Sequence, residues 1–256
     1  MPDPSRGSSK REAARQRIAA KRAAEAAAHA AARRRQRTIV GGVVAAVVLV
    51  VALVAAIVVQ TSRTSAPASA ATPPNTTDGG NVIVVGSAAA PVTVDLYEDL
   101  QCPNCKVFED AAGSTLAQLV AAGTVQAHYH GMAFLDTTAN GAYSTRALNA
   151  AAVVLGTAGP DAFQTFHDLL YAHQPAESGS GLTDDQLIQY AAQAGASGAQ
   201  VEQQIHDLHY GDWVKKVTDQ ASKDGVTGTP TVFVDSTKLA DPSAAGLTAA
   251  VTAAQQ

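Results

Sequence analysis

Two cysteines three positions apart are the residues best suited to chemistry in this chain. Cys102 and Cys105 are the only cysteines among its 256 residues, and they occur in the segment Cys-Pro-Asn-Cys. A pair at this spacing can close on itself, but it cannot staple distant parts of a fold, which takes more cysteines at wider spacing. The spacing therefore favours redox chemistry or metal binding over a structural disulfide.

The residues around the pair predict a strand that leads directly into a helix. Residues 92–97 are rich in β-branched side chains, and a helical pattern runs from the cysteines to about Ala122. Pro103 suits the first helical turn, because its missing N–H would have no partner there. Cys102 then lies at a helix N-terminus, where unpaired N–H groups and the helix dipole stabilise a thiolate. Cys105, one turn later, is placed to attack a mixed disulfide formed at Cys102.

Other predicted elements surround this unit. Strands near both ends of residues 81–256, with a block of helices between them, imply an α/β domain with a helical insertion. The further strands are expected at residues 82–85, 125–129 and 231–234, the helical block at about residues 138–222 with breaks near 156–160, 175–181 and 195–198, and a closing helix at 243–256.

The cysteine segment resembles the active site of the DsbA-like branch of the thioredoxin superfamily. A second segment, Val-Thr-Gly-Thr229-Pro230-Thr, is similar to that family's V-x-G-T-P-T loop. The resemblance covers about residues 81–256 and implies a thioredoxin-like fold without a cofactor. It also implies that Pro230 is cis and faces the disulfide, and that Thr229 presents backbone atoms to the substrate peptide. Pro103 and Asn104, between the cysteines, would support the same site.

The chain departs from this family at two positions. Asn104 stands where enteric members have His, which can stabilise the thiolate as a charged neighbour, so we expect a less extreme oxidant. Leu96 stands six residues before the first cysteine, where many relatives have a carboxylate. Asp95, Glu98 and Asp99 lie nearby. Because acids with perturbed pKa values cluster at active sites, Glu98 and Asp99 are candidate proton relays.

The first 80 residues predict a membrane anchor and a tether. Residues 38–59 contain no charged side chain and, as a helix, would cross the roughly 30 Å hydrocarbon core. Residues 1–37 hold 11 of the 18 Lys and Arg, and such residues before a span keep that end in the cytoplasm. Residues 60–80 are mostly Ser, Thr, Ala, Pro and Gly and are expected to form a flexible linker.

We therefore expect a single-pass cell-membrane protein with a cytoplasmic N-terminus and an extracytoplasmic domain, residues 81–256. Cleavage of the apolar run as a signal peptide stays open, because small-residue sites follow it.

The charges and the histidines bear on two other classes of ligand. After residue 37 the chain has 7 basic and 19 acidic residues, which argues against nucleic acid, since phosphate binding needs clustered Lys and Arg. Zinc at the cysteine pair is disfavoured because the usual second pair of ligands at short spacing is missing. His128 and His130 would face the same side of a strand and are expected to form a polar strand edge. Ordinary helix-surface positions are expected for His167, His173, His206 and His209.

The resemblance and the compartment together predict the function. Outside the cytoplasm, newly exported chains need disulfides. The first expectation is a dithiol oxidase that acts on thiol-containing exported proteins and is reoxidised by a membrane redox partner. A reductase or an isomerase stays open, because these enzymes share the site chemistry. A non-catalytic thioredoxin-like binding module, with an inert disulfide, is the alternative from another class.

Overall fold

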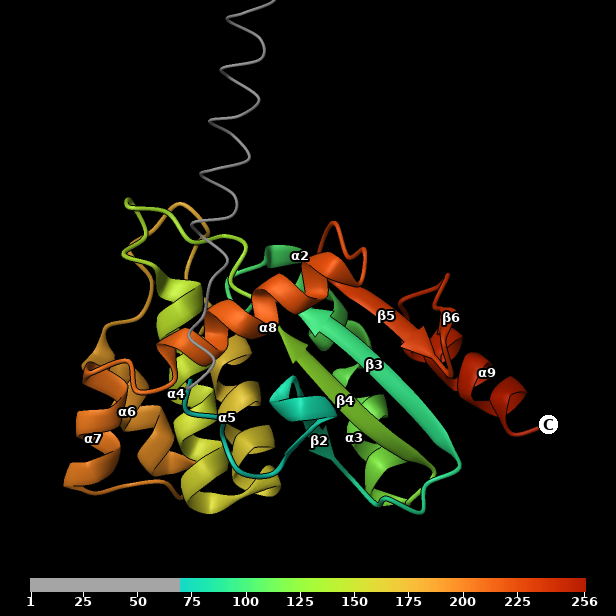
Figure 1. Ribbon diagram of the computed structural model, residues 1–256. Coiled ribbons are helices and arrows are strands. Elements are labelled where there is room, and N and C mark those ends of the chain that lie inside the picture. The colour runs from blue at the N-terminus through green and yellow to red at the C-terminus, as the bar shows by residue number, and fades with distance from the viewer. Residues whose placement is uncertain (1–69) are drawn as a thin grey trace, which may run out of the picture. The chain divides into compact units, whose positions relative to one another are not determined.

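The structure is a computed structural model that describes residues 70–256 (Figure 1). The predicted cytoplasmic segment and the predicted membrane span at residues 38–59 lie outside these residues, as does the first part of the predicted linker. Within residues 70–256, no helix combines the length and the apolar character needed to cross a bilayer.

A mixed sheet of six strands, in the order β1-β2-β4-β3-β5-β6, forms the centre of the described domain. The central strands β3 and β4 are parallel, and every other neighbouring pair is antiparallel. All four predicted strands are present, with β3 and β4 slightly longer than predicted. The strands are β1 (Thr76–Thr77), β2 (Val82–Val85), β3 (Val92–Glu98), β4 (Val125–Gly131), β5 (Thr231–Val234) and β6 (Thr237–Lys238).

The helices fall into two groups. The helices of one group lie between β3 and β4 or after β6. Those of the other group lie between β4 and β5 and form the predicted insertion. The first group is α2 (Pro103–Phe108), α3 (Ser114–Ala121) and α9 (Ala244–Ala254). The second group is α4 (Tyr143–Ala158), α5 (Pro160–Ala172), α6 (Asp184–Gln193), α7 (Ala199–His206) and α8 (Gly211–Lys223). The break between α7 and α8 was not predicted; it contains Leu208 with a positive φ of 51°.

The two faces of the sheet differ in burial because successive side chains of a strand point to opposite faces. Ile83, Tyr129 and Leu96 are register partners on one face, and each is at most 3% exposed. This face packs against α3 and α9, whose Leu116, Leu247 and Val251 belong to the same buried core. The other face is only half-buried, and α8 crosses it in Figure 1.

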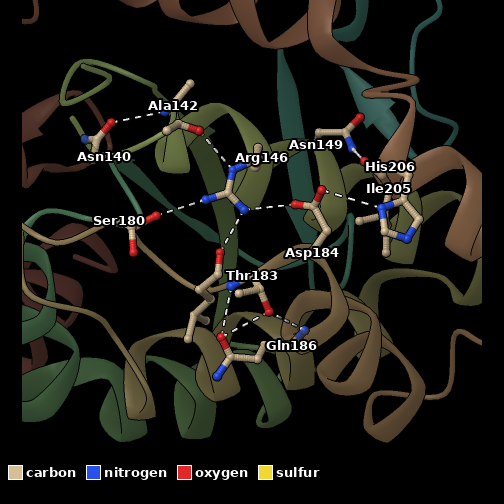
Figure 2. A network of polar contacts seen from close by, with 12 residues as sticks. Asn140, Ala142, Arg146, Asn149, Ser180, Thr183, Asp184, Gln186, Ile205 and His206 are labelled. Carbon is tan, nitrogen blue, oxygen red and sulfur yellow. Dashed lines mark hydrogen bonds and ion pairs between the residues drawn. The ribbon is translucent and has the colours of Figure 1, made fainter. Parts of the chain in front are cut away.

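Arg146 of α4 ties the ends of the insertion helices together (Figure 2). Its guanidinium donates to the Leu182 carbonyl at 2.7 Å, to Asp184 Oδ1 at 2.9 Å and to the Ser180 carbonyl at 3.2 Å. Asp184 Oδ2 lies 3.5 Å from His206 Nδ1 at the end of α7. The network fixes the start of α6 against both α4 and α7.

The folded domain begins before the predicted start at Asn81. β1 pairs with β2, and the buried Trp213 of α8 donates its indole N–H to the Gly80 carbonyl. Lys216 Nζ donates to the Gly79 carbonyl at 2.6 Å. Residues 76–80, predicted to belong to the flexible linker, are therefore a strand and a 3-10 turn of the domain.

Candidate active site

Cys102 caps a helix that contains a π-helical turn. The backbone is helical through α2, a π turn at Glu109–Gly113, and α3. The helix predicted from the cysteines to about Ala122 is thus confirmed, with Pro103 in its first turn. The π turn was not predicted; such turns are frequent at functional sites.

The two sequence motifs meet at Cys102. Its backbone is extended, its side chain is 6% exposed, and its Sγ lies 3.4 Å from the carbonyl oxygen of Thr229. The Thr229–Pro230 peptide bond is cis, as the resemblance implies. Cys105, 1% exposed, lies behind Cys102, and both cysteines are free thiols. Two free thiols one helical turn apart, of which Cys102 is the more exposed, form the arrangement that dithiol–disulfide exchange requires.

The two thiols have opposite pKa shifts. The hydrogen bond from the Cys105 thiol is the largest cause that lowers the pKa of Cys102 to about 5, against the effect of burial. Hydrogen bonding with Thr229 and with the backbone N–H groups of Cys105 and Asn104 lowers it further. That same hydrogen bond and burial raise the pKa of Cys105 far above its ordinary value. The pair therefore keeps its proton on Cys105 and its negative charge on Cys102.

The helical insertion holds the turn that carries the cysteines. Gln174, just after α5, donates from Nε2 to the carbonyls of Leu100 at 3.1 Å and Cys102 at 3.0 Å. Gln101 Nε2 donates in turn to the Glu177 carbonyl at 3.0 Å. Two carbonyls beside the nucleophile are thus held by one side chain from the insertion.

Asp99 lies fully buried beneath this turn. Its carboxylate accepts hydrogen bonds from the N–H groups of Gln101 at 2.9 Å and Leu135 at 3.0 Å, and from the Ser144 hydroxyl at 2.6 Å. Burial raises the pKa of Asp99 to about 6, although these hydrogen bonds oppose the rise. These contacts make the Asp99 carboxylate an organiser of the backbone around the site.

Glu98 forms a buried ion pair next to Cys105. Its two carboxylate oxygens lie 2.9 and 3.0 Å from His167 Nε2, and the Tyr171 hydroxyl donates to Oε2 at 3.1 Å. Glu98 is 4% exposed and His167 is 1% exposed. Burial alone would lower the pKa of His167, but the charge of Glu98 and hydrogen bonds to Glu98 and Asp168 raise it well above its usual value. The negative charge of Glu98 also helps to raise the pKa of Cys105.

The prediction that His167 is a helix-surface residue is wrong. His167 lies one turn from both Phe163 and Tyr171, on the face of α5 that is buried. This apolar stripe on α5 is the sequence signal that could have identified it. In contrast, His173, His206 and His209 are exposed, as predicted.

Glu109, in the π turn, extends this cluster toward the surface. One ligand atom each from Glu98, Glu109 and His167 lie within 4.8 Å of one another. Burial is the largest cause that raises the pKa of Glu109 to about 7. A groove of about 220 Å³ is lined by Glu109, Asp168 and Tyr171, among others, and it brings solvent to this side of the cluster. The arrangement can therefore exchange a proton between the region of Cys105 and water.

Comparison with known proteins agrees with this geometry. The profile of a family described as "Thioredoxin" matches residues 78–253. A Mycobacterium tuberculosis disulfide bond oxidoreductase, DsbG, in its reduced form is 33% identical with a TM-score of 0.62, covering 69% of this chain and 88% of that one. Oxidised DsbA of M. tuberculosis is also 33% identical, with a TM-score of 0.60 and coverage of 67% and 91%.

Curated relatives match over shorter stretches. The serine/threonine-protein kinase PknE of M. tuberculosis is 33% identical over 114 residues, which are 43% of this chain but 20% of the kinase. The chain thus spans about a fifth of the length of these kinases. The probable disulfide bond formation protein D of Bacillus cereus is 29% identical over 158 residues, covering 60% of this chain and 69% of that protein. With the cysteine pair facing a cis Thr229–Pro230 bond, the matches show that the chain belongs to the thioredoxin family, on its DsbA-like branch of thiol–disulfide oxidoreductases.

Proposed function

We propose that this chain is an extracytoplasmic thiol–disulfide oxidoreductase that introduces disulfides into exported proteins. One observation carries the proposal: the pair keeps its negative charge on Cys102, whose pKa is lowered to about 5, at a sulfur in contact with Thr229. A stable Cys102 thiolate favours the reduced form of the enzyme, so oxidation of a substrate dithiol runs downhill.

The reaction begins with the Cys102–Cys105 disulfide. A substrate thiolate attacks Cys102 Sγ, which forms a mixed disulfide and releases Cys105 as a thiolate. Cys105 then takes up a proton, because its pKa is raised. A second substrate thiolate attacks the substrate sulfur of the mixed disulfide, which completes the substrate disulfide and releases the Cys102 thiolate. The substrate loses two electrons, and the pair gains them.

Glu98 is the group proposed to exchange the proton of Cys105. Its carboxylate is buried beside the pair, where water has little access, and His167 and Tyr171 hold it in place. The cluster meets solvent at Asp168, which is 62% exposed and lies 3.4 Å from His167 Nδ1. Asp99, the second candidate relay, is held by backbone N–H groups and Ser144, so we assign the relay to Glu98.

The location and partners belong to the same proposal. The charge-free run at residues 38–59 and the basic residues before it support an uncleaved anchor with a cytoplasmic N-terminus. The domain would then act outside the cytoplasm, on thiol-containing exported proteins. Turnover as an oxidase needs a membrane redox partner that takes two electrons from the reduced pair, and an anchored domain stays close to such a partner.

The reduction potential of the pair tests the direction of electron flow. We expect equilibration with glutathione to give a value between roughly −270 mV, as in thioredoxin, and roughly −120 mV, as in DsbA. Asn104 has no charge to stabilise the thiolate, which supports a value below the upper end. A potential at or below that of thioredoxin would make the chain a reductase.

Trapping of substrates tests whether the pair is catalytic. Cys102→Ser should abolish oxidation of a reduced substrate protein. With an oxidised substrate protein, the Cys102 thiolate of Cys105→Ser should attack the substrate disulfide and accumulate mixed disulfides, because no second enzyme thiol is left to displace the substrate. If wild type does not oxidise the reduced substrate and Cys105→Ser forms no mixed disulfide, the domain is a binding module.

A further inference from the structure

Three side chains of types that bind metals, one Asp and two His, converge on the half-buried face of the sheet, opposite the face that packs against α3 and α9. Asp95 of β3 is the register partner of His128 of β4, and His130 follows two residues later on the same strand. Asp95 Oδ1 lies 3.3 Å from His128 Nδ1 and 2.9 Å from His130 Nε2. Their side chains are 26%, 24% and 15% exposed, respectively, so water can reach the point where they meet.

A neutral His128 ring cannot satisfy both of its polar contacts in this cluster. His128 Nε2 lies 3.0 Å from Gln126 Oε1 and Nδ1 lies 3.3 Å from Asp95 Oδ1, so both ring nitrogens face an oxygen. A neutral ring carries one N–H and can donate to only one of these oxygens, which leaves a lone pair facing the other. A cation between that nitrogen and the oxygen it faces, or a second proton on the ring, removes this repulsion.

Neighbouring side chains hold the two rings in orientation. Gln126 fixes the ring of His128, and Tyr97 stacks on His130 with ring centroids 4.1 Å apart and planes 17° apart. Histidines that bind metals have this kind of outer-shell support, in which the other ring N–H donates to an oxygen. Since Nε2 faces Gln126, Nδ1 on the side of Asp95 is the nitrogen of His128 that would bind the ion.

The spacing of the donor atoms fits a bound ion. With bonds of about 2.0–2.1 Å, ligand atoms around one ion lie roughly 2.9–3.4 Å apart, for octahedral to tetrahedral arrangements. The two separations from Asp95 Oδ1, 3.3 and 2.9 Å, lie in this range. All three ligand atoms lie within 4.8 Å of one another, so a small contraction would bring them around one ion.

We propose that Asp95, His128 and His130 bind one divalent transition-metal ion of the zinc type, with water at the remaining positions. Two imidazoles and one carboxylate favour such an ion over Ca²⁺ and Mg²⁺, which prefer oxygen ligands. The site would join the two central strands of the sheet. It was missed in the sequence because its third ligand comes from a neighbouring strand 33 residues before His128.

The proposal is independent of the redox pair. The other cluster of this kind among the described residues is Glu98, Glu109 and His167, in which Glu98 and His167 are only 4% and 1% exposed and Tyr171 also donates to the Glu98 carboxylate, so we do not assign an ion to it. The reduced cysteines could also bind zinc. The test therefore uses the full chain without an affinity tag and with the Cys102–Cys105 disulfide closed, which removes the thiols as ligands.

Equilibrium dialysis with Zn²⁺ and absorption spectroscopy with Co²⁺ measure the binding. The oxidised protein should bind one equivalent, with visible Co²⁺ bands of nitrogen and oxygen ligation. Gln126→Leu should weaken binding by roughly 10- to 100-fold, the usual effect of losing an outer-shell partner. His128→Gln and Asp95→Asn should weaken it more. His206→Gln is the matched control, since His206 also contacts an aspartate, and it should leave the affinity unchanged.

Two results would overturn the proposal. One is binding that is equal in wild type, His128→Gln and Asp95→Asn, which would place the ion elsewhere on the chain. The other is no binding at neutral pH together with nitrogen NMR shifts of a doubly protonated His128, which would make the cluster an ion pair. Disulfide exchange by His128→Gln is measured in parallel and should match wild type, so failure of this proposal is separate from failure of the redox function.

Discussion

Replacing Cys105 tests, at the scale of single residues, how the Cys102 thiolate is stabilised. The Cys105 thiol is the largest cause that lowers the pKa of Cys102 to about 5, ahead of the backbone N–H groups at the helix end. In Cys105→Ala, the pKa of Cys102 should rise toward the ordinary value of about 8.5 without reaching it, because those N–H groups remain. Cys105→Ser keeps a hydroxyl donor and should give a smaller rise. The pH dependence of the alkylation rate measures both, and an unchanged midpoint in Cys105→Ala would contradict this account.

The buried pair of His167 and Glu98 makes the second prediction at this scale. Removing one partner of a buried ion pair leaves an uncompensated charge, which typically destabilises a protein by about 3–5 kcal/mol. His167→Leu should therefore lower the free energy of unfolding by about that amount in urea titrations. Adding Glu98→Gln to His167→Leu should recover part of the loss. His173→Leu, at an exposed position just after the same helix, is the control and should stay within about 0.5 kcal/mol of wild type.

The stability that the His167–Glu98 pair contributes depends on pH in a defined direction. The pKa of His167 is raised above its unfolded value of about 6.5. The stabilisation from His167 is then fully present below that pH and is lost as pH rises through the folded pKa. The difference in stability between wild type and His167→Leu/Glu98→Gln, which leaves no unpaired carboxylate, should be largest below about pH 6.5 and should shrink as the pH rises above that value. A difference that shrinks between pH 5 and 6 would mean that His167 is neutral in the folded protein.

Gln174 tests the coupling between elements. It connects the end of α5 to the carbonyls of Leu100 and Cys102, so its loss should loosen the turn between β3 and α2. We expect Gln174→Ala to reduce stability by roughly 1–3 kcal/mol, since two buried acceptors lose their donor. Amide hydrogen exchange should speed up at the start of α2. Gln193→Ala, at an exposed position of α6, should change neither quantity, and equal exchange in both variants would show that the insertion does not hold the turn.

At the scale of elements, the sequence predicted those strands and helix ends whose signals lie within the element itself. The strands β2, β3, β4 and β5 and the Pro103 helix start were predictable, because each signal lies within a few residues. The β5–β6 hairpin was missed because its turn residues, Asp235 and Ser236, adopt positive φ without the usual Asn-Gly signal. The π turn at Glu109–Gly113 was also missed.

The candidate site divides in the same way. Cys102, Cys105, Thr229 and Pro230 could be predicted because two motifs identify them. His167 could not be assigned a role from its own element, because its partner Glu98 lies 69 residues away in another element. The contact between Asp95 and His128 could not be predicted either, because it depends on the parallel pairing of β3 and β4. Contacts between distant segments depend on the register of the sheet, which local periodicity does not provide.

At the scale of the whole described domain, residues 70–256, the stability of the fold must depend on the redox state of the cysteine pair. The lowered pKa of Cys102 stabilises the reduced protein relative to its unfolded chain, whose thiols titrate near pH 8.5. This contribution is fully present above about pH 8.5 and is lost as pH falls through about 5. The oxidised protein has no such thiolate and lacks the contribution.

Thermal unfolding of the two redox states therefore tests the charge on Cys102 in the intact protein. At pH 7 the reduced protein should have the higher Tm, and the gap between the two values should close as the pH is lowered to about 5. The raised pKa of Cys105 adds nothing to this slope, because its effect appears only above about pH 8.5. A Cys102→Ser variant, which has neither the disulfide nor the thiolate, is the control for pH effects elsewhere in the chain. If the oxidised protein were the more stable form at pH 7, the disulfide would be a structural bond and the pair would be a poor oxidant.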